Sequence, residues 1–526
     1  MPRSLASIRK DLIPILVLLV FAVIVSLPSL HATSIDDLDS AHHLMDGYFF
    51  RDLILDHPHS LSYVFNYYKQ YPALGFIFWP PLFPFVLGLF ALVAGDHVLV
   101  GRACIFFFGV IFTLAFYALL RRQFPTWLAF CATLSAITIP GLFWSFNQIK
   151  LELPTLAVMC LALLAYLHAR DKVAEPSSIP RALFTALALA AVVYTKQPAY
   201  FLYLAIVLDV LCIPALLRKR ETWVTVAALV IFIVPLALFT LKFGRANLAQ
   251  SIGTNTKLIM SSYEAIPRWS FAAWSYYPRL VGSLLNPVVA LLGIGGLILC
   301  MTSRSFRSAN RIWLGWFFLF YLTFSFYDNR VPRHSSFWWP AWIVLATACL
   351  YGIMQRLPRS ATLALPVLFL LPVPFQIAQG ERHEYADFYG QMPIVQNLFS
   401  TGDPGNILIF GPDKQTWIAY IREADHERKT HVLRGESLLA AGFTLPEICR
   451  KFRVGTMLVE VPSGSASPDA SEPQVGVSEL NSIPGLSRGP DAHFTYAGHD
   501  VLVMQYRYTG IKDAVMPDIP LSNRLM

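Results

Sequence analysis

Long apolar runs separated by short polar loops occupy most of the first 377 residues of the chain. The first run, residues 12–30, has the length of roughly 20 residues that a helix needs to cross the core of a bilayer. Other apolar runs follow near 77–95, 101–120, 126–146, 152–169, 182–199, 200–217, 222–241, 280–301, 312–327, 337–355 and 361–377. We therefore predict a polytopic α-helical membrane protein with about 11 to 13 transmembrane helices.

The pattern changes after about residue 378. Short segments rich in branched and aliphatic side chains, bounded by Gly, Pro or Asp, predict strands at 406–410, 456–461 and 500–504. Residues 445–452 predict a helix with Thr444 as its N-cap, and 462–473 predict a flexible loop. We predict a transmembrane domain over 1–377 and a small soluble α/β domain over 378–526.

Basic residues predict the orientation of the helices, because Lys and Arg are enriched in cytoplasmic loops. Arg3, Arg9 and Lys10 precede the first apolar run and place the N-terminus in the cytoplasm. Further basic clusters lie at 170–181, 218–220, 304–311 and 356–359. If those loops are cytoplasmic, then a first loop at 31–76, a second at 242–279 and the C-terminal domain face outward.

The beginning of the chain has the wrong parity for this arrangement. Three apolar stretches separate the outward loop 31–76 from Glu152, which should also face outward. A cytoplasmic N-terminus and an external C-terminus require an odd number of spans. Two alternatives remain open: the Pro-rich stretch 77–95 is half-length or re-entrant, or one apolar run contains two helices.

The composition supports a membrane protein and argues against other classes. Of the 526 residues, 55% are hydrophobic and 14% are charged, against roughly a quarter charged in soluble domains. The net charge of +8 does not indicate nucleic-acid binding, because the basic residues cluster between apolar runs. Most of the seven cysteines lie in or beside apolar segments, so we expect neither a zinc site nor a disulfide framework.

An acidic cluster follows the first apolar run, where a charge close to lipid is costly unless it has a role. A helix over 35–47 would place four side chains on one face, namely Asp36, Asp39, His43 and Asp46. Such a face could bind a hard cation or position a general base. The alternative is structural, because Ser34 followed by Asp37 resembles a helix-capping box.

Further charged residues stand at the ends of later apolar runs. Glu152 opens one run, where it could act in chemistry or only complement the helix dipole, with Lys150 neutralising it. Lys196 interrupts an apolar stretch, so it either snorkels or meets an anion. Arg333 lies in a turn that suits phosphate binding, and Arg330 in the same turn could pair with Asp328.

The motifs of the chain occur in the order Asp36-Asp37-Leu38-Asp39-Ser40-Ala41-His42, Pro80-Pro81-Leu82-Phe83-Pro84, Gly101-Arg102, Glu152-Leu153-Pro154, Thr195-Lys196-Gln197-Pro198 and Arg333-His334 through Pro340. This ordered set resembles the GT-C-type glycosyltransferases, and among them the family of protein O-mannosyltransferases and lipid A aminoarabinose transferases. The resemblance covers most of residues 12–377. The chain departs from the family where many relatives have Lys before Pro-Pro, because Trp79 stands there.

The resemblance implies a membrane enzyme that transfers one sugar, with inversion, from a polyprenyl-phosphate donor to an external lipid, glycan or protein acceptor. In this family's scheme Asp36 or Asp37 deprotonates the acceptor, and Glu152 orients the acceptor or a metal. Lys196 and Arg333 hold the phosphate. A list of further candidates implied by the resemblance contains Trp79, Arg279 and His334 for substrate binding, and Asp36, His42 and His43 for a divalent cation. The loop 242–279 would cover the donor.

A transporter or flippase of lipid-linked sugars is the alternative interpretation. It would explain the cations in apolar stretches, but neither the acidic cluster nor the external domain. It would also favour paired repeats with interrupted helices, which the sequence does not show. The resemblance further implies a multi-pass protein of the bacterial inner membrane, whose C-terminal domain is periplasmic or extracellular.

Overall fold

The chain, seen in a computed structural model, forms two compact units. Unit 1 comprises residues 1–31, 79–83 and 102–383, and unit 2 comprises 32–78, 84–101 and 384–526. The structure describes residues 5–30, 32–75, 79–243, 266–267, 269–326, 330–382, 388–462, 477–496 and 498–520. Unit 2 therefore combines the C-terminal region with two segments from the first 101 residues, a grouping that the apolar pattern does not predict.

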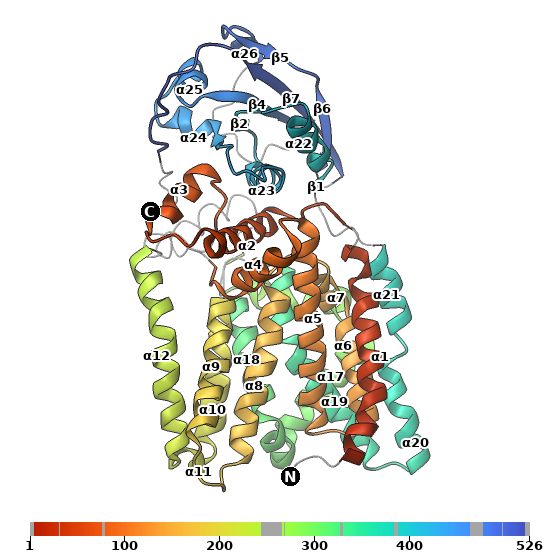
Figure 1. Cartoon of the computed structure of the whole chain (residues 1–526). Helices are drawn as coiled ribbons and strands as arrows, with labels where there is room; N and C mark the ends of the chain where they lie inside the picture. Colours follow the sequence, from red (N-terminus) through yellow and green to blue (C-terminus); the bar gives the residue numbers. More distant parts are fainter. Residues whose placement is uncertain are drawn as a thin grey trace. The chain divides into compact units, whose positions relative to one another are not determined.

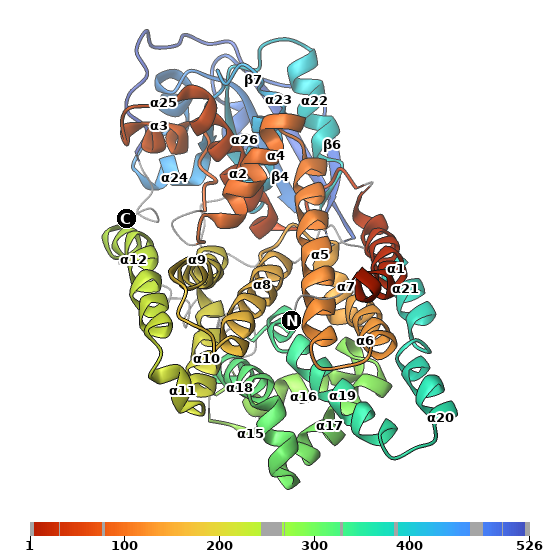
Figure 2. The ribbon, with the colours of Figure 1, turned by 60° about the horizontal axis from the view of Figure 1, so that its bottom comes forward.

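Unit 1 is a bundle of long apolar helices (Figures 1 and 2). Its helices are α1 (Leu5–Leu30), α5 (Val98–Arg121), α6 (Thr126–Thr138), α7 (Pro140–Phe146), α8 (Glu152–Asp171), α9 (Ile179–Thr195), α10 (Phe201–Leu211), α11 (Pro214–Leu217), α12 (Arg220–Phe243), α15 (Phe271–Trp274), α16 (Tyr276–Leu284), α17 (Pro287–Thr302), α18 (Arg304–Phe326), α19 (Trp339–Met354), α20 (Arg359–Ala364) and α21 (Val373–Glu381). Neighbouring helices pack in the pairs α8–α9, α9–α12, α10–α18 and α17–α19.

Several of these helices have the length and composition of membrane spans. Within the described part of the chain, α1, α5, α8, α12 and the stretch Thr362–Glu381 are long and apolar enough to cross a bilayer. The pair α6–α7 passes the same test as one bent segment, with 70° between its halves. The apolar helices α9, α10, α17 and α19 are shorter. The predicted class of a polytopic helical membrane protein with a small C-terminal sheet is confirmed.

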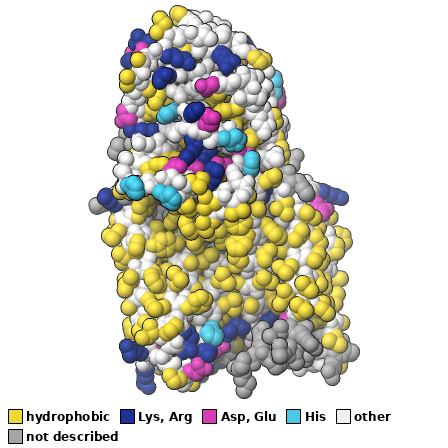
Figure 3. Space-filling model, viewed as in Figure 1, with side chains coloured by type: hydrophobic (Ala, Val, Ile, Leu, Met, Phe, Trp, Pro, Cys, Tyr) yellow, Lys and Arg dark blue, Asp and Glu magenta, His cyan; other side chains and the backbone are white. Residues whose placement is uncertain are grey.

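The outer surface of unit 1 matches a lipid environment. Only 6% of the apolar window of α12 is buried, and its exposed side chains include Val230, Ile231 and Leu238. Figure 3 shows hydrophobic side chains covering the helices of this unit, with Lys and Arg gathered beyond them at the end where α11 lies. This distribution fits apolar helices flanked by basic loops.

Unit 2 contains helices and one mixed sheet. The helices are α2 (Leu38–Asp56), α3 (Ser62–Gln70), α4 (Leu82–Ala94), α22 (Gln391–Ser400), α23 (Lys414–Ala424), α24 (Gly435–Ala440), α25 (Leu445–Lys451) and α26 (Val477–Asn481). The strands are β1 (Phe388–Tyr389), β2 (Asn406–Phe410), β3 (Val432–Arg434), β4 (Val454–Pro462), β5 (Leu486–Arg488), β6 (Ala492–Tyr496) and β7 (His499–Tyr508).

The sheet has seven strands in the order β1-β6-β7-β4-β2-β3, and β5 also pairs with β7. Strand β2 is parallel to β3 and β4, whereas the other pairs are antiparallel. The three predicted strands correspond to β2, β4 and β7. The predicted helix is α25, and Thr444 forms a capping box with Glu447 at its start. Most of the predicted loop 462–473 lies outside the described residues.

Helix α4 bears on the parity of the early spans. Its 13 residues extend over about 20 Å at 1.5 Å per residue, which is short of the roughly 30 Å hydrocarbon core. Pro80 and Pro81 precede its first residue, where a helix tolerates proline. The half-length alternative for 77–95 therefore fits the structure.

The packing of α17 on α19 generates a stability prediction. A Cβ atom added at Gly296 would come within 2.3 Å of the Leu345 carbonyl oxygen on α19. We expect Gly296→Ala to lower the free energy of unfolding by about 1–3 kcal/mol, the usual cost of overpacking. Thermal unfolding of the purified protein in detergent measures this, with Gly282→Ala as the control, because a Cβ at Gly282 has no atom within 4 Å. Equal melting temperatures for the two variants would contradict the prediction.

Candidate active site

The acidic segment of unit 2, which comprises Asp36, Asp37 and helix α2, begins with a helix cap. Asp37 has extended backbone angles, φ −161° and ψ −174°, and its side chain accepts the Ser40 N–H at 3.0 Å. An Asp at this position stabilises a helix by about 1 kcal/mol relative to alanine. The helix therefore begins at Leu38. The predicted capping box of Ser34 and Asp37 is therefore wrong, because Asp37 is itself the N-cap.

Asp36 precedes the helix and is 1% exposed. Its Oδ2 accepts a hydrogen bond of 3.3 Å from the Ser40 hydroxyl. The predicted helix over 35–47 begins too early, because the cap at Asp37 excludes Asp36 from it. The predicted common face is therefore wrong for Asp36, whereas Asp39, His43 and Asp46 do lie on α2.

Two side chains of α2 hold the segment 73–75 against the helix. The Asp46 carboxylate accepts the Gly75 N–H at 2.7 Å. The His42 Nδ1 lies 2.6 Å from the Ala73 carbonyl oxygen, so this nitrogen donates the hydrogen bond. Burial lowers the pKa of His42 below its ordinary value, against the opposing effect of that bond. The His42 side chain thus connects helix α2 to the segment after α3.

The described residues contain no cluster of metal ligands that corresponds to the predicted cation site. Within the described ranges, no three His, Cys, Asp or Glu side chains are placed to hold one metal ion. The site at Asp36, His42 and His43 stays a prediction from the resemblance. No chemical step below depends on a metal.

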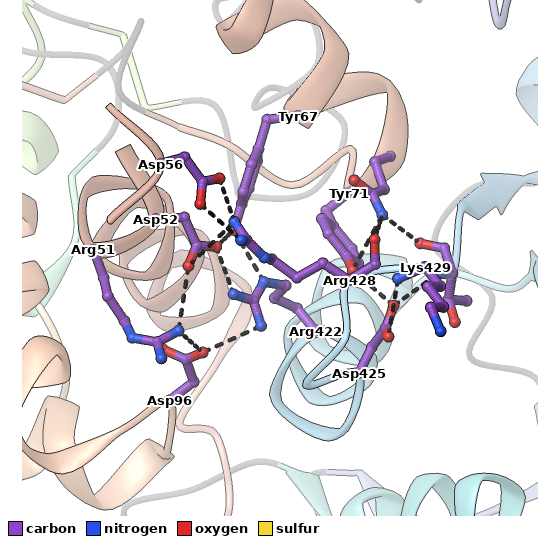
Figure 4. Close-up of polar contacts among 12 residues, drawn as sticks. Arg51, Asp52, Asp56, Tyr67, Tyr71, Asp96, Arg422, Asp425, Arg428 and Lys429 are labelled. Carbon is purple, nitrogen blue, oxygen red and sulfur yellow. Dashed lines mark hydrogen bonds and ion pairs between the residues drawn. The ribbon is translucent and has the colours of Figure 1, made fainter. Parts of the chain in front are cut away.

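A buried ion-pair network joins the acidic segment to the C-terminal region within unit 2 (Figure 4). Arg422 on α23 pairs with Asp52 on α2 and, at 3.2 Å, with Asp96 in the α4–α5 connection. Arg51 pairs with Asp96 at 2.6 Å and with Asp52 at 3.2 Å. The Tyr67 hydroxyl donates to Asp52 at 2.9 Å. Side chains of Arg422 and Asp52 are each 1% exposed.

This network is electrostatically balanced around Arg422. Burial raises the pKa of Asp96 above its ordinary value, and the adjacent Arg422 and Arg51 oppose that rise. At the edge of the network, Arg428 binds Asp56 through two hydrogen bonds of 2.5 and 2.8 Å. Those bonds are the main cause of a lowered pKa at Asp56. Apolar periodicity could not have revealed the network, because Arg422 lies more than 300 residues from Asp52 and Asp96 in the sequence.

A second charged cluster lies in unit 1, where helices α8 and α9 meet their loops. Glu152 is the first residue of α8 and is 2% exposed. Lys196 follows α9 in an extended conformation and donates to Glu152 Oε1 at 2.7 Å. Arg333, in the 3₁₀ helix Pro332–Phe337, has its Nε 3.8 Å from the same oxygen. The structure thus brings together three predicted site residues from separate parts of the sequence.

Aromatic rings support the cations of this cluster. The Lys196 Nζ lies 5.2 Å from the centre of the Phe337 ring, and the Lys150 Nζ lies 4.5 Å from the Trp144 ring. A cation over an aromatic face gains about 0.5–2 kcal/mol. Lys150 therefore contacts the Trp144 ring, whereas Lys196 forms the hydrogen bond to Glu152. Neutralisation by Lys150 is not the main interaction of Glu152.

Beside Arg333, His334 is buried with its ring 4.6 Å from that of Phe324. Arg330 donates to the Ser325 carbonyl at 3.0 Å and to the Ile266 carbonyl at 2.9 Å. Its expected partner Asp328 lies outside the described residues. Arg330 therefore serves to hold the turn, whereas Arg333 faces Glu152.

Two further predicted substrate-binding residues, Arg279 and Trp79, lie outside the cluster around Glu152. Arg279 is exposed on α16, and Trp79 is partly buried in the short segment 79–83 of unit 1. In the predicted covering loop 242–279, residues 244–265 and 268 lie outside the described ranges. The part that is described includes Tyr277, which is buried with its ring 4.7 Å from that of Trp338.

One contact that sequence reasoning missed fixes the approach to α8. The Asn147 side chain donates to the Val25 carbonyl at 2.8 Å and accepts the Ser29 N–H at 3.2 Å. Its own carbonyl accepts from Arg102 at 3.2 Å. Asn147 precedes the motif with Glu152 by five positions. In the sequence, the position of this polar amide between two apolar runs could have indicated that its side chain forms hydrogen bonds.

A comparison with protein families matches one segment of the chain. Residues 79–239 match the family described as dolichyl-phosphate-mannose-protein mannosyltransferase. No curated protein matches the sequence significantly.

Solved structures match over much more of the chain. ArnT from Cupriavidus metallidurans, in the apo state, shares 14% identity, with 93% of this chain and 97% of that chain covered and a TM-score of 0.57. The oligosaccharyltransferase of Archaeoglobus fulgidus shares 11% identity over 87% of this chain and 70% of that chain, with a TM-score of 0.55. Arabinofuranosyltransferase AftD from Mycobacteria shares 14% identity over 96% of this chain but 40% of that chain, with a TM-score of 0.50.

These matches share the fold of membrane-embedded sugar transferases. At such identities the structural matches establish the fold alone, and the family match covers residues 79–239 only. The chain therefore has the fold of these solved proteins, and the family match over residues 79–239 agrees with the resemblance found in its motifs.

The buried network of unit 2 yields a stability prediction. Arg422→Met would leave Asp52 and Asp96 buried with one cation fewer, and breaking a buried pair costs about 3–5 kcal/mol. We expect a fall in the melting temperature of the purified protein, measured in detergent. Arg488→Met is the control, because Arg488 forms an exposed pair with Asp491 and such pairs contribute little. An unchanged melting temperature for Arg422→Met would contradict the structural role of the network.

Proposed function

We propose that this protein transfers a single sugar from a polyprenyl-phosphate donor to a hydroxyl or phosphate group of an acceptor outside the cytoplasm, by inverting displacement. The observation that carries the proposal is the cationic cluster around Glu152. The family match over residues 79–239 supports glycosyl transfer in general. The choice of donor, acceptor and stereochemistry belongs to the proposal.

The cluster suits a phosphate leaving group. Lys196 and Arg333 place two cationic side chains beside the single carboxylate of Glu152, at the polar end of an apolar helix. The pairing with Glu152 fixes both cations before any substrate binds, which is how pre-organised charge stabilises a transition state. We assign Lys196 and Arg333 to the departing polyprenyl phosphate, and Glu152 to holding them.

The acceptor needs a general base, and Asp36 is our candidate. Its carboxylate takes the proton of the acceptor hydroxyl while that oxygen attacks the anomeric carbon. The bond between the anomeric carbon and the phosphate oxygen breaks, and the electron pair leaves with polyprenyl phosphate. Asp37 is the weaker candidate, because its side chain already accepts the Ser40 N–H as a helix cap.

The comparisons support the donor class and the location. The matching family is named for dolichyl-phosphate-mannose, a lipid-phosphate sugar. One match, which covers 93% of this chain and 97% of the other, is to a protein of Cupriavidus metallidurans. We therefore propose a bacterial inner-membrane enzyme with its C-terminal region outside the cytoplasm.

The first test replaces the proposed base. We expect Asp36→Asn to lower the transfer rate by about 10²–10⁴-fold, the usual contribution of a general base. The assay uses protein in liposomes with a panel of polyprenyl-phosphate monosaccharides, and it measures sugar transferred and polyprenyl phosphate released. Asp37→Asn should lose far less, because Asn caps a helix as well as Asp does.

Two outcomes would overturn this assignment. Equal activity of Asp36→Asn and the wild type removes Asp36 from the mechanism. Movement of intact donor across the bilayer without release of polyprenyl phosphate would favour the transporter alternative instead.

The second test addresses the phosphate site. We expect Lys196→Gln to raise the donor KM about 10–100-fold, the equivalent of one charge-assisted hydrogen bond of about 1.5–3 kcal/mol. The control is Arg304→Gln, an exposed arginine at the opposite end of α18 from Arg333. A donor KM that changes equally in both variants would count against a phosphate contact at Lys196.

A further inference from the structure

Helix α23 of the C-terminal region contacts the acidic segment directly, next to the proposed base. The Tyr420 hydroxyl oxygen accepts the Ile35 N–H at 2.7 Å. Ile35 is the residue before Asp36 in the chain. Ile35 and Tyr420 are 0% and 1% exposed, so water does not compete for this hydrogen bond. All three residues belong to unit 2.

The same helix holds the acidic segment at a second point. Arg422, two residues after Tyr420, pairs with Asp52 near the end of α2 (Figure 4). The neighbouring Glu423 lies 2.9 Å from the His97 Nδ1 in the α4–α5 connection. Figure 4 shows the Arg422 guanidinium between the carboxylates of Asp52 and Asp96.

The two points of attachment lie at opposite ends of a rigid element. Residues 38 and 52 of α2 are about 21 Å apart along the helix axis, at 1.5 Å per residue. The first point fixes the chain just before Asp36, and the second fixes the orientation of the helix that follows it. Asp36 is also held from within the segment by the Ser40 hydroxyl. Its carboxylate is therefore positioned by a helix that lies nearly 400 residues later in the sequence.

We propose that Tyr420 and Arg422 are positioning residues, through which the C-terminal α/β region sets the place of the Asp36 carboxylate. The inference rests on the proposed function of Asp36. It assigns the C-terminal region a role in the reaction itself, in addition to any contact with an acceptor. A displacement of a reacting group by about 1 Å can lower a rate about 100-fold, so a single lost anchor is measurable.

Tyr420→Phe is the sharpest variant, because it removes one hydroxyl and keeps the aromatic ring. We expect kcat to fall about tenfold while the donor KM and the melting temperature stay near the wild-type values. The donor is the panel member, such as polyprenyl-phosphate mannose, that the wild type consumes. Hydrogen exchange at the amides of residues 34–38 should become faster, since the Ile35 N–H loses its acceptor.

The matched control is Tyr506→Phe on β7. Tyr506 is also buried in unit 2, but its hydroxyl contacts the Met504 sulfur at 3.8 Å and lies in the core of the sheet. Tyr506→Phe removes a tyrosine hydroxyl from unit 2, as Tyr420→Phe does, but this hydroxyl forms no hydrogen bond to Ile35. We expect neither kcat nor hydrogen exchange at residues 34–38 to change.

Asp36→Asn in the same assay separates the two proposals. If Asp36→Asn abolishes transfer while Tyr420→Phe matches Tyr506→Phe in kcat, the positioning proposal is overturned and the proposed base stands. If Asp36→Asn retains full transfer, the proposed function fails and the positioning proposal fails with it. A selective fall in kcat for Tyr420→Phe, with an inactive Asp36→Asn, supports both.

Discussion

The cost of burying an unpaired charge governs both units of this protein. An isolated ion in a low-dielectric interior is unfavourable by several kcal/mol even after relaxation, so each buried ionic side chain needs a partner of opposite sign. In unit 1 the partner of Glu152 is Lys196. In unit 2 Arg422 supplies the partner for Asp52 and Asp96. These pairings decide which segments distant in sequence must lie together.

The pairings also connect structure to the proposed chemistry. The cluster at Glu152 contains more positive than negative charge, which leaves it suited to an anion. The network at Arg422 has the opposite consequence, because its charges satisfy one another and fix the helix that carries the acidic segment. In the proposed reaction the cluster at Glu152 receives the donor phosphate, whereas the network at Arg422 holds helix α2 in place.

Apolar periodicity predicted much of the fold. The runs 152–169 and 222–241 correspond to α8 and α12, and the strand at 406–410 matches β2 residue for residue. These segments are specified locally, by length and by the alternation of side chains. The start of α2 was not predicted correctly, because a single side chain, Asp37, determines where the helix begins.

The sequence also indicated candidate residues better than it indicated their partners. The sequence indicates Glu152, Lys196 and Arg333 as charges beside apolar runs or in a turn, but nothing local specifies that they meet. Nothing in the sequence singles out Arg422, since an arginine on an amphipathic helix is ordinary until its partner is known. Pairings across long sequence separations depend on the packing of the whole unit.

The anomeric configuration of the transferred sugar tests the central claim most directly. Wild-type protein in liposomes would be given a polyprenyl-phosphate sugar of known configuration, and the linkage in the product would be determined by nuclear magnetic resonance. Direct displacement by an acceptor oxygen predicts release of polyprenyl phosphate together with an inverted linkage. A retained configuration, or release of free sugar without transfer, would contradict the account.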